Sequence, residues 1–166
     1  MSDVLTRPDA NRKPAAKLVA PASDFTVDLK EVAEKHGLAI FSTDLPPGVS
    51  GMLCKRPELG TKSGFVIFTK ASEPAVRQRF TAAHEIGHFV LHKHLIGDGV
   101  EDNYLLRSDR LSSRVEVEAN KFAARLLMPM NQVDRAMRQG IRSPKDLAKA
   151  FGVSEVAMAI QLGLPT

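Results

Sequence analysis

The spacing of hydrophobic and polar residues divides the chain into a helical, a strand-like and a second helical region. A short amphipathic helix is expected between Asp28 and Gly37, where the glycine ends it. Short apolar runs, separated by turns rich in Pro and Gly, come next. These runs cover residues 38–41, 49–54 and 64–68. They predict a small antiparallel sheet built from short strands.

The pattern becomes helical again at Pro74, a residue suited to a first helical turn. Apolar residues then recur every three or four positions as far as His92, which predicts a long amphipathic helix. Residues 95–112 contain Gly and Asp and predict a flexible or lid-like loop. A second long helix is expected from Ser113 to Met128, because a proline follows and stops it.

The two ends of the chain differ from this central part. Residues 1–24 combine several prolines with mixed charge and no apolar periodicity, and this composition predicts a disordered tail. Residues 131–166 contain capping signals and short helical patterns with the rhythm of a helix-turn-helix motif. We therefore expect a principal domain at residues 25–130, with the C-terminal helical segment packed on it or extending it.

The main candidate for chemistry is the segment His84-Glu85-Ile86-Gly87-His88, which has the HExxH pattern inside a predicted helix. Residues four positions apart lie on one face of a helix, so His84 and His88 can bind one metal ion. Glu85 is the neighbouring carboxylate that can act as general base. The pattern predicts a zinc-dependent peptidase, with Glu85 as the catalytic base that takes a proton from the attacking water.

Zinc in a catalytic site needs a third protein ligand, and two histidines near the motif are poor candidates. His94 has the spacing of an HExxHxxGxxH motif, but Leu91 stands where that motif needs Gly to turn the chain. On an unbroken helix His94 would point away from the face of His88. His92 lies on that face, yet three side chains on successive turns of one straight helix lie in a row and cannot surround one ion.

A glutamate on the next predicted helix is the better candidate, and both Glu116 and Glu118 qualify by residue type. Glu116 and Asn120 are four positions apart, so they share one helix face. Asn120 could then accept the proton on the far nitrogen of a ligand histidine, as partners of zinc-bound imidazoles commonly do. Glu118 is rotated by about 200° from Glu116, so both cannot face the metal. We expect Glu116 to be the ligand and Glu118 a solvated neighbour.

Two segments of the chain resemble the ImmA/IrrE family of metallopeptidases. The run from Arg79 to His88, followed by Leu91-His92, is similar to that family's segment RFTxAHExGHxxLH. Residues 116–129 (EVEANKFAARLLMP) resemble its second helix, and the end of the chain, up to Gly163, resembles its usual ending. The resemblance covers about residues 28 to 164.

The resemblance implies an α+β fold of the zincin type. We expect a small antiparallel sheet packed on the HExxH helix and a glutamate helix, followed by the C-terminal helices. It also implies that His84, His88 and Glu116 hold Zn²⁺ and that Glu85 is catalytic. The implied substrate is a protein, a helix-turn-helix transcriptional repressor or antitoxin, whose cleavage controls stress or mobile-element genes. The alternative is a transcriptional regulator or partner-binding module with a structural zinc site.

Charge and composition narrow the remaining function classes. The net charge of +4 permits a nucleic-acid contact, but Glu155 is the only charged residue of the last predicted helix, so direct DNA binding is disfavoured. No apolar run approaches the ~18 residues that span a bilayer. The single cysteine, Cys54, excludes a disulfide framework within the chain, and no secretory signal is recognisable. We expect a cytoplasmic protein, and the sequence predicts no oligomeric state.

Overall fold

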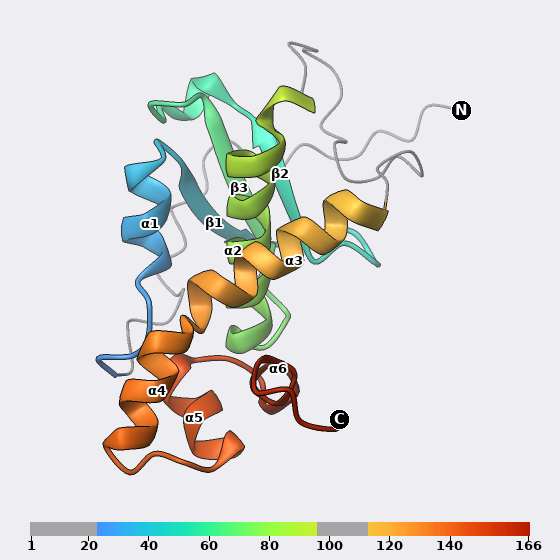
Figure 1. The fold of residues 1–166 in the computed structure, drawn as a ribbon. Helices are drawn as coiled ribbons and strands as arrows, with labels where there is room; N and C mark the ends of the chain where they lie inside the picture. The colour runs from blue at the N-terminus through green and yellow to red at the C-terminus, as the bar shows by residue number, and fades with distance from the viewer. Residues whose placement is uncertain (1–22, 96–112) are drawn as a thin grey trace.

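The computed structural model describes residues 23–95 and 113–166, and Figure 1 shows their arrangement. The predicted loop at 95–112 and the predicted tail at 1–24 therefore lie outside the described residues, apart from Leu95, Ser23 and Asp24. The longest helix in these two ranges has 18 residues. None of the helices within the two described ranges has the length and hydropathy needed to cross a bilayer.

The described part of the chain contains a small sheet and a larger number of helices, so the predicted α+β fold is confirmed. In chain order the elements are α1 (Leu29–Lys35), β1 (Ala39–Thr43), β2 (Gly51–Lys55), η1 (Pro57–Leu59), β3 (Phe65–Lys70), α2 (Ala75–His92), η2 (Lys93–Leu95), α3 (Ser113–Leu127), α4 (Met130–Arg138), α5 (Pro144–Phe151) and α6 (Glu155–Gln161). Three of these helices, α1, α5 and α6, begin after a residue whose side chain accepts a hydrogen bond from a backbone N–H of the first turn. These capping residues are Asp28, Ser143 and Ser154.

The three strands form a mixed sheet in the order β1-β3-β2. β2 pairs with β3 in the antiparallel sense, but β1 pairs with β3 in the parallel sense. The prediction of an antiparallel sheet is therefore correct for one strand pair and wrong for the other. After β1 the chain passes through Pro46-Pro47-Gly48, where two residues lack the N–H that strand pairing needs. It then enters β2 at the far edge, and β3 fills the central position.

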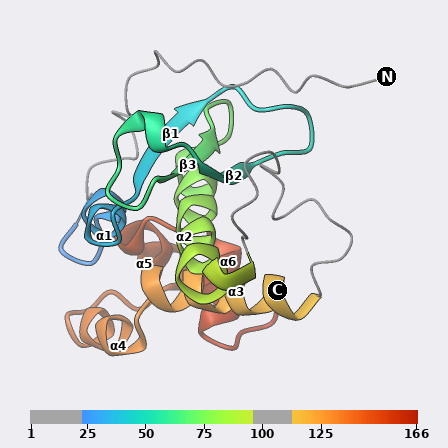
Figure 2. The same cartoon turned by 90° about the horizontal axis from the view of Figure 1, so that it is seen from above.

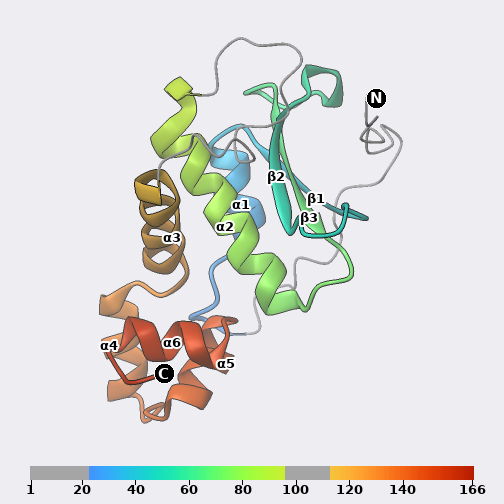
Figure 3. The ribbon, with the colours of Figure 1, turned by 90° about the vertical axis from the view of Figure 1, so that its right-hand side faces the viewer.

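The sheet, α2 and α3 form successive layers, seen from above in Figure 2 and from the side in Figure 3. α2 packs on one face of the sheet, where the rings of Phe65 and Phe89 meet edge to face at 5.5 Å. α3 crosses the opposite side of α2. A Cβ added at Gly87 would lie 3.0 Å from the ring of Phe122, so this glycine permits the close approach of the two helices.

The C-terminal helices share a hydrophobic core with the rest of the described chain. Phe25 stacks on Phe151 at 5.4 Å. The buried guanidinium of Arg79 donates to the carbonyls of Val27 and Gly152 at 3.0 and 3.2 Å. These contacts connect α2 to both ends of the described chain. The expected division of the chain into two parts at residue 130 stays a prediction. In Figure 1, α4, α5 and α6 lie together below the layers formed by the sheet, α2 and α3.

Candidate metal centre

The HExxH residues lie near the middle of α2, where the helix packs between the sheet and α3. His84 and His88 are one turn apart, and their Nε2 atoms lie 2.9 Å from each other. Their rings meet edge to face with centroids 4.5 Å apart. Both side chains therefore aim their Nε2 atoms at one point beside the helix, as the spacing of four residues predicts.

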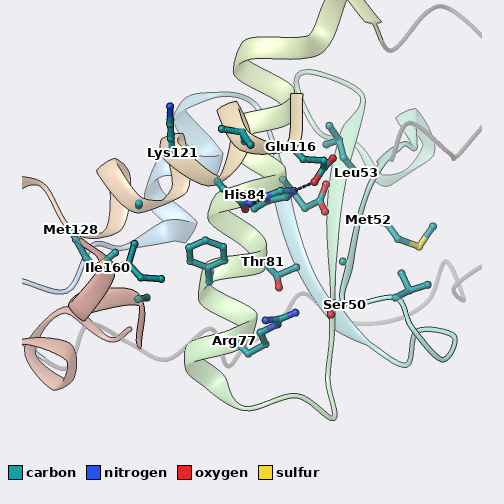
Figure 4. Close-up of a pocket in the computed structure, with 18 of the residues that line it drawn as sticks. Ser50, Met52, Leu53, Arg77, Thr81, His84, Glu116, Lys121, Met128 and Ile160 are labelled. Carbon is teal, nitrogen blue, oxygen red and sulfur yellow. Dashed lines mark hydrogen bonds and ion pairs between the residues drawn. The ribbon is translucent and has the colours of Figure 1, made fainter. Parts of the chain in front are cut away.

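Glu116, in the first turn of α3, brings a carboxylate to the same point. Its Oε2 lies 3.2 Å from Nε2 of His84, and its Oε1 lies 3.3 Å from Nε2 of His88. Figure 4 shows His84 and Glu116 facing each other across the two helices. Among the described residues, His84, His88 and Glu116 are the one group whose donor atoms all lie within 4.8 Å of one another.

These distances fit a tetrahedral metal ion. Donors at 2.0–2.1 Å from a tetrahedral zinc ion are ~3.3 Å from each other, close to the separations found here. Two imidazole nitrogens and one carboxylate oxygen also form a donor set that divalent first-row metals accept. With three protein donors, the fourth position of a tetrahedral ion is left for water or substrate, as in catalytic sites.

Asn120, one turn after Glu116 on α3, holds the first histidine. Its Oδ1 lies 2.9 Å from Nδ1 of His84. A histidine that donates from Nδ1 keeps its Nε2 lone pair free for a metal ion. The structure thus brings together all the residues that the sequence singles out for the metal site and its support.

A second set of contacts holds His88, and sequence reasoning missed it. Nδ1 of His88 lies 3.1 Å from Nδ1 of the buried His92, and Nε2 of His92 lies 3.1 Å from Oε2 of Glu118. The other carboxylate oxygen of Glu118 accepts from Nε of Arg114 at 2.8 Å. We expected Glu118 to be only a solvated neighbour, and we considered His92 only as a metal ligand and rejected it. The regular spacing of four between positions 84, 88 and 92 was the signal available in the sequence.

The environment of His88 keeps its imidazole neutral. Burial, with smaller effects from His84 and His92, lowers the pKa of His88 to about 3. A neutral imidazole is the form that binds metal ions.

Glu85 is buried and lies against the edge strand β2. A Cβ added at Gly51 would collide with Cγ2 of Thr81 and come within 3.3 Å of Oε1 of Glu85, so the strand can approach only because it has glycine there. No hydrogen bond from the described residues reaches the buried Oε2 of Glu85. Burial and, to a smaller extent, Glu116 raise the pKa of Glu85 to about 8. A carboxylate whose pKa is raised by burial is a stronger base than an exposed one, which suits it to accepting a proton.

His84, Glu85 and Glu116 line a cleft of about 790 Å³. β2 and the residues before it form one side, α2 forms the floor, and α3 and α6 form the other side. Figure 4 shows this cleft, with Ser50 and Met52 on the strand side and Lys121, Met128 and Ile160 on the helical side. The cleft is the size of sites that bind small molecules or a few residues of a peptide.

Comparisons with known proteins connect this geometry to a peptidase family. Residues 33–162 match the family described as the IrrE N-terminal-like domain. The radiation response metalloprotease IrrE of Deinococcus deserti is 31% identical over an alignment of 142 residues, and the match covers 79% of this chain and 46% of that protein. The protein of the same name from Deinococcus radiodurans is 37% identical over an alignment of 146 residues, and the match covers 81% of this chain and 43% of that protein. The chain thus spans less than half the length of these relatives.

A solved structure, described as a Mycobacterium tuberculosis transcriptional regulator, is also similar. It aligns with a TM-score of 0.54 and 21% identity, over 82% of this chain and 39% of the other chain. At this level of identity the likeness shows a common fold alone.

Proposed function

Because this chain belongs to the IrrE N-terminal-like family of peptidases, we propose that it is a zinc-dependent endopeptidase. The observation that best supports this activity is the meeting of three donor atoms beside a buried carboxylate. His84, His88 and Glu116 supply the donors, and Glu85 lies next to them at the floor of an open cleft. A structural zinc site is normally closed by four protein ligands, and the described residues bring three together.

In this proposal His84, His88 and Glu116 hold the ion. Zinc at this position supplies Lewis acidity and lowers the pKa of a water molecule. The carboxylate of Glu85 takes a proton from the attacking water and returns it to the nitrogen of the leaving amine. Asn120 and His92 hold the two ligand imidazoles with their Nε2 atoms aimed at the site.

The edge strand offers a place for the peptide backbone. Within the described residues β2 pairs with β3 alone, and in this proposal an extended chain pairs with its other edge. A substrate peptide that adds to this edge lies along the cleft, above Glu85. Such pairing recognises the main chain of any extended segment and leaves side-chain selection to the cleft walls.

The finer part of the proposal concerns the substrate and its setting. We propose that the protein cuts a helix-turn-helix repressor or antitoxin in the cytoplasm and so controls stress or mobile-element genes. The name of the two Deinococcus relatives, radiation response metalloprotease, supports a stress setting. The two segments that resemble ImmA/IrrE metallopeptidases support a repressor substrate.

The decisive experiment separates metal binding from catalysis. We would measure the zinc content of the wild-type protein, His84→Ala, Glu116→Ala and Glu85→Gln by elemental analysis. Cleavage of purified helix-turn-helix regulators from the same genome would be followed by mass spectrometry. We expect about one zinc per chain in wild type and Glu85→Gln, with none in the ligand variants. Glu85→Gln should lose cleavage by at least about 100-fold while keeping the metal.

Two outcomes would contradict the proposal. Full cleavage by Glu85→Gln would exclude Glu85 as the base. Absence of zinc from the reconstituted wild-type protein would exclude the metal site itself.

A further inference from the structure

The cleft extends well beyond the metal-site residues along the helices that form it. On α2, the lining residues Arg77, Phe80 and Thr81 precede His84 on the same helix face. Phe80 is four residues before His84, or about 6 Å along the helix axis. On α3 the lining continues from Glu116 to Ala124, which is about 12 Å. The cleft therefore has length enough for several residues of an extended chain.

The far part of the cleft is apolar, and we call it the apolar end. It is lined by Phe80, Ala124, Met128, Ala157 and Ile160, which come from α2, from α3 and the residue after it, and from α6. Met128 and Ile160 lie near each other on the side of α6 in Figure 4. The side-chain amide of Gln161 donates to the carbonyl of Met128 at 2.9 Å and so fixes α6 beside α3.

Ile160 is the informative member of the apolar end. It is 65% exposed, although Ile is among the residues most often buried in proteins. Together with the other apolar residues of the cleft wall, it forms a contiguous apolar surface beside the candidate metal site, and such a surface is typical of a site that binds a ligand. The apolar end is continuous with the site of the proposed peptidase, so its natural occupant is part of the same substrate.

We propose that the apolar end binds one bulky apolar side chain of the substrate, and that Ile160 of α6 sets this preference. The cleft runs about 6 Å along α2 from His84 to Phe80 and about 12 Å along α3 from Glu116 to Ala124. These lengths correspond to two to four residues of extended chain, so this side chain lies within four residues of the scissile bond. The proposal rests on the endopeptidase function and adds its side-chain specificity. It gives the last described helix a role in choosing the substrate.

The test compares two exposed apolar residues of the same helix. Ile160→Asp changes the apolar end, whereas Val156→Asp changes a residue that is 60% exposed but does not line the cleft. The probe is a library of blocked decapeptides with randomised sequences. Cleaved bonds would be identified by mass spectrometry with zinc-loaded enzyme. Binding would be measured separately, by affinity selection from the same library on zinc-loaded Glu85→Gln with and without each second change.

We expect wild type to prefer Leu or Phe over Ala by about 10-fold at one position within four residues of the cut. Ile160→Asp should reduce this ratio to less than about threefold, and Ile160→Leu should restore it. Val156→Asp should stay within about twofold of wild type. The peptides selected on Glu85→Gln should show the same dependence on residue 160, which a purely structural role would not produce.

Other outcomes separate this proposal from the function on which it rests. An unchanged preference in Ile160→Asp, with cleavage intact, would overturn the apolar end as a specificity site and leave the peptidase function standing. Absence of cleavage by wild type, together with selection of apolar peptides on Glu85→Gln, would overturn the peptidase function and support the binding site. If Ile160→Asp changed only the oligomeric state in analytical ultracentrifugation, the surface would be an interface between copies, and the specificity proposal would fail.

Discussion

The two histidines that we propose as metal ligands are neighbours on one helix, yet they are held in different ways. We call His84 with Asn120 the amide arm, and His88 with His92, Glu118 and Arg114 the relay arm. The amide arm is a single contact of 2.9 Å to a residue of α3, and the side chain of His84 is 15% exposed. The relay arm passes through three contacts, and the side chain of His88 is 3% exposed.

The difference follows from where each imidazole lies. Water can reach the surroundings of His84, so one amide oxygen is enough to orient the ring. His88 is buried, and an unpaired N–H there would be costly, so a partner inside the protein is required. The next turn of α2 supplies His92, and α3 supplies the carboxylate that completes the relay.

The relay arm also has only one arrangement of protons that leaves His88 ready for a metal ion. If Nε2 of His88 keeps its lone pair, Nδ1 must donate to Nδ1 of His92. Nε2 of His92 then carries a proton and donates to Glu118, which also accepts from Arg114. The amide arm lacks this constraint, because a single amide satisfies His84 directly.

The largest expected effect comes from removing each ligand. His88→Ala and His84→Ala should both abolish zinc binding, as measured by elemental analysis. His88→Ala should also destabilise the metal-free protein by about 2 kcal/mol in urea unfolding, because it leaves a cavity and an unpaired His92. His84→Ala should cost about 1 kcal/mol or less, since water can replace the lost contact. Equal losses of stability would mean that burial does not distinguish the two arms.

A smaller effect is expected when the first partner of each ligand is removed. His92→Phe keeps the volume but leaves Nδ1 of His88 unpaired, so zinc affinity should fall by about 100-fold. Asn120→Ala should lower it by about 10-fold, because water can take the place of the amide. Competition with a chromophoric chelator measures both affinities, and His92→Gln should recover part of the loss. The comparison would be wrong if Asn120→Ala proved the more damaging change.

The smallest effect is expected at the outer links of the relay arm. Glu118→Gln keeps an oxygen that can accept from His92, so zinc affinity should fall by less than about 10-fold. Arg114 is 84% exposed, and its replacement by Ala should change zinc affinity by less than about twofold. The same competition assay would detect these changes, with Lys121→Ala on the same helix as a control. A large loss in Arg114→Ala would show that the relay depends on its exposed end.

Features within one helix could be predicted from the sequence, and features that depend on how helices and strands meet could not. The positions of His84, Glu85 and His88 follow from helical spacing alone. Glu116 and Asn120 could be paired with them because they too share one helix face. The contact between His92 and Glu118 depends on the crossing of α2 and α3, which spacing does not determine. The parallel pairing of β1 with β3 likewise depends on a long-range contact, and the alternation of residues along either strand does not predict its direction.

The missing side chain of Gly87 connects metal binding to folding. It lets α2 and α3 come close enough for donors from both helices to reach one point. Only the docked helices present all three donors together, so an ion bound there acts as a reversible crosslink between distant parts of the chain. By mass action, a free ion at 100 times its dissociation constant would stabilise the folded chain by about 2.7 kcal/mol. The availability of metal in the surroundings would then set how firmly these two helices are held together.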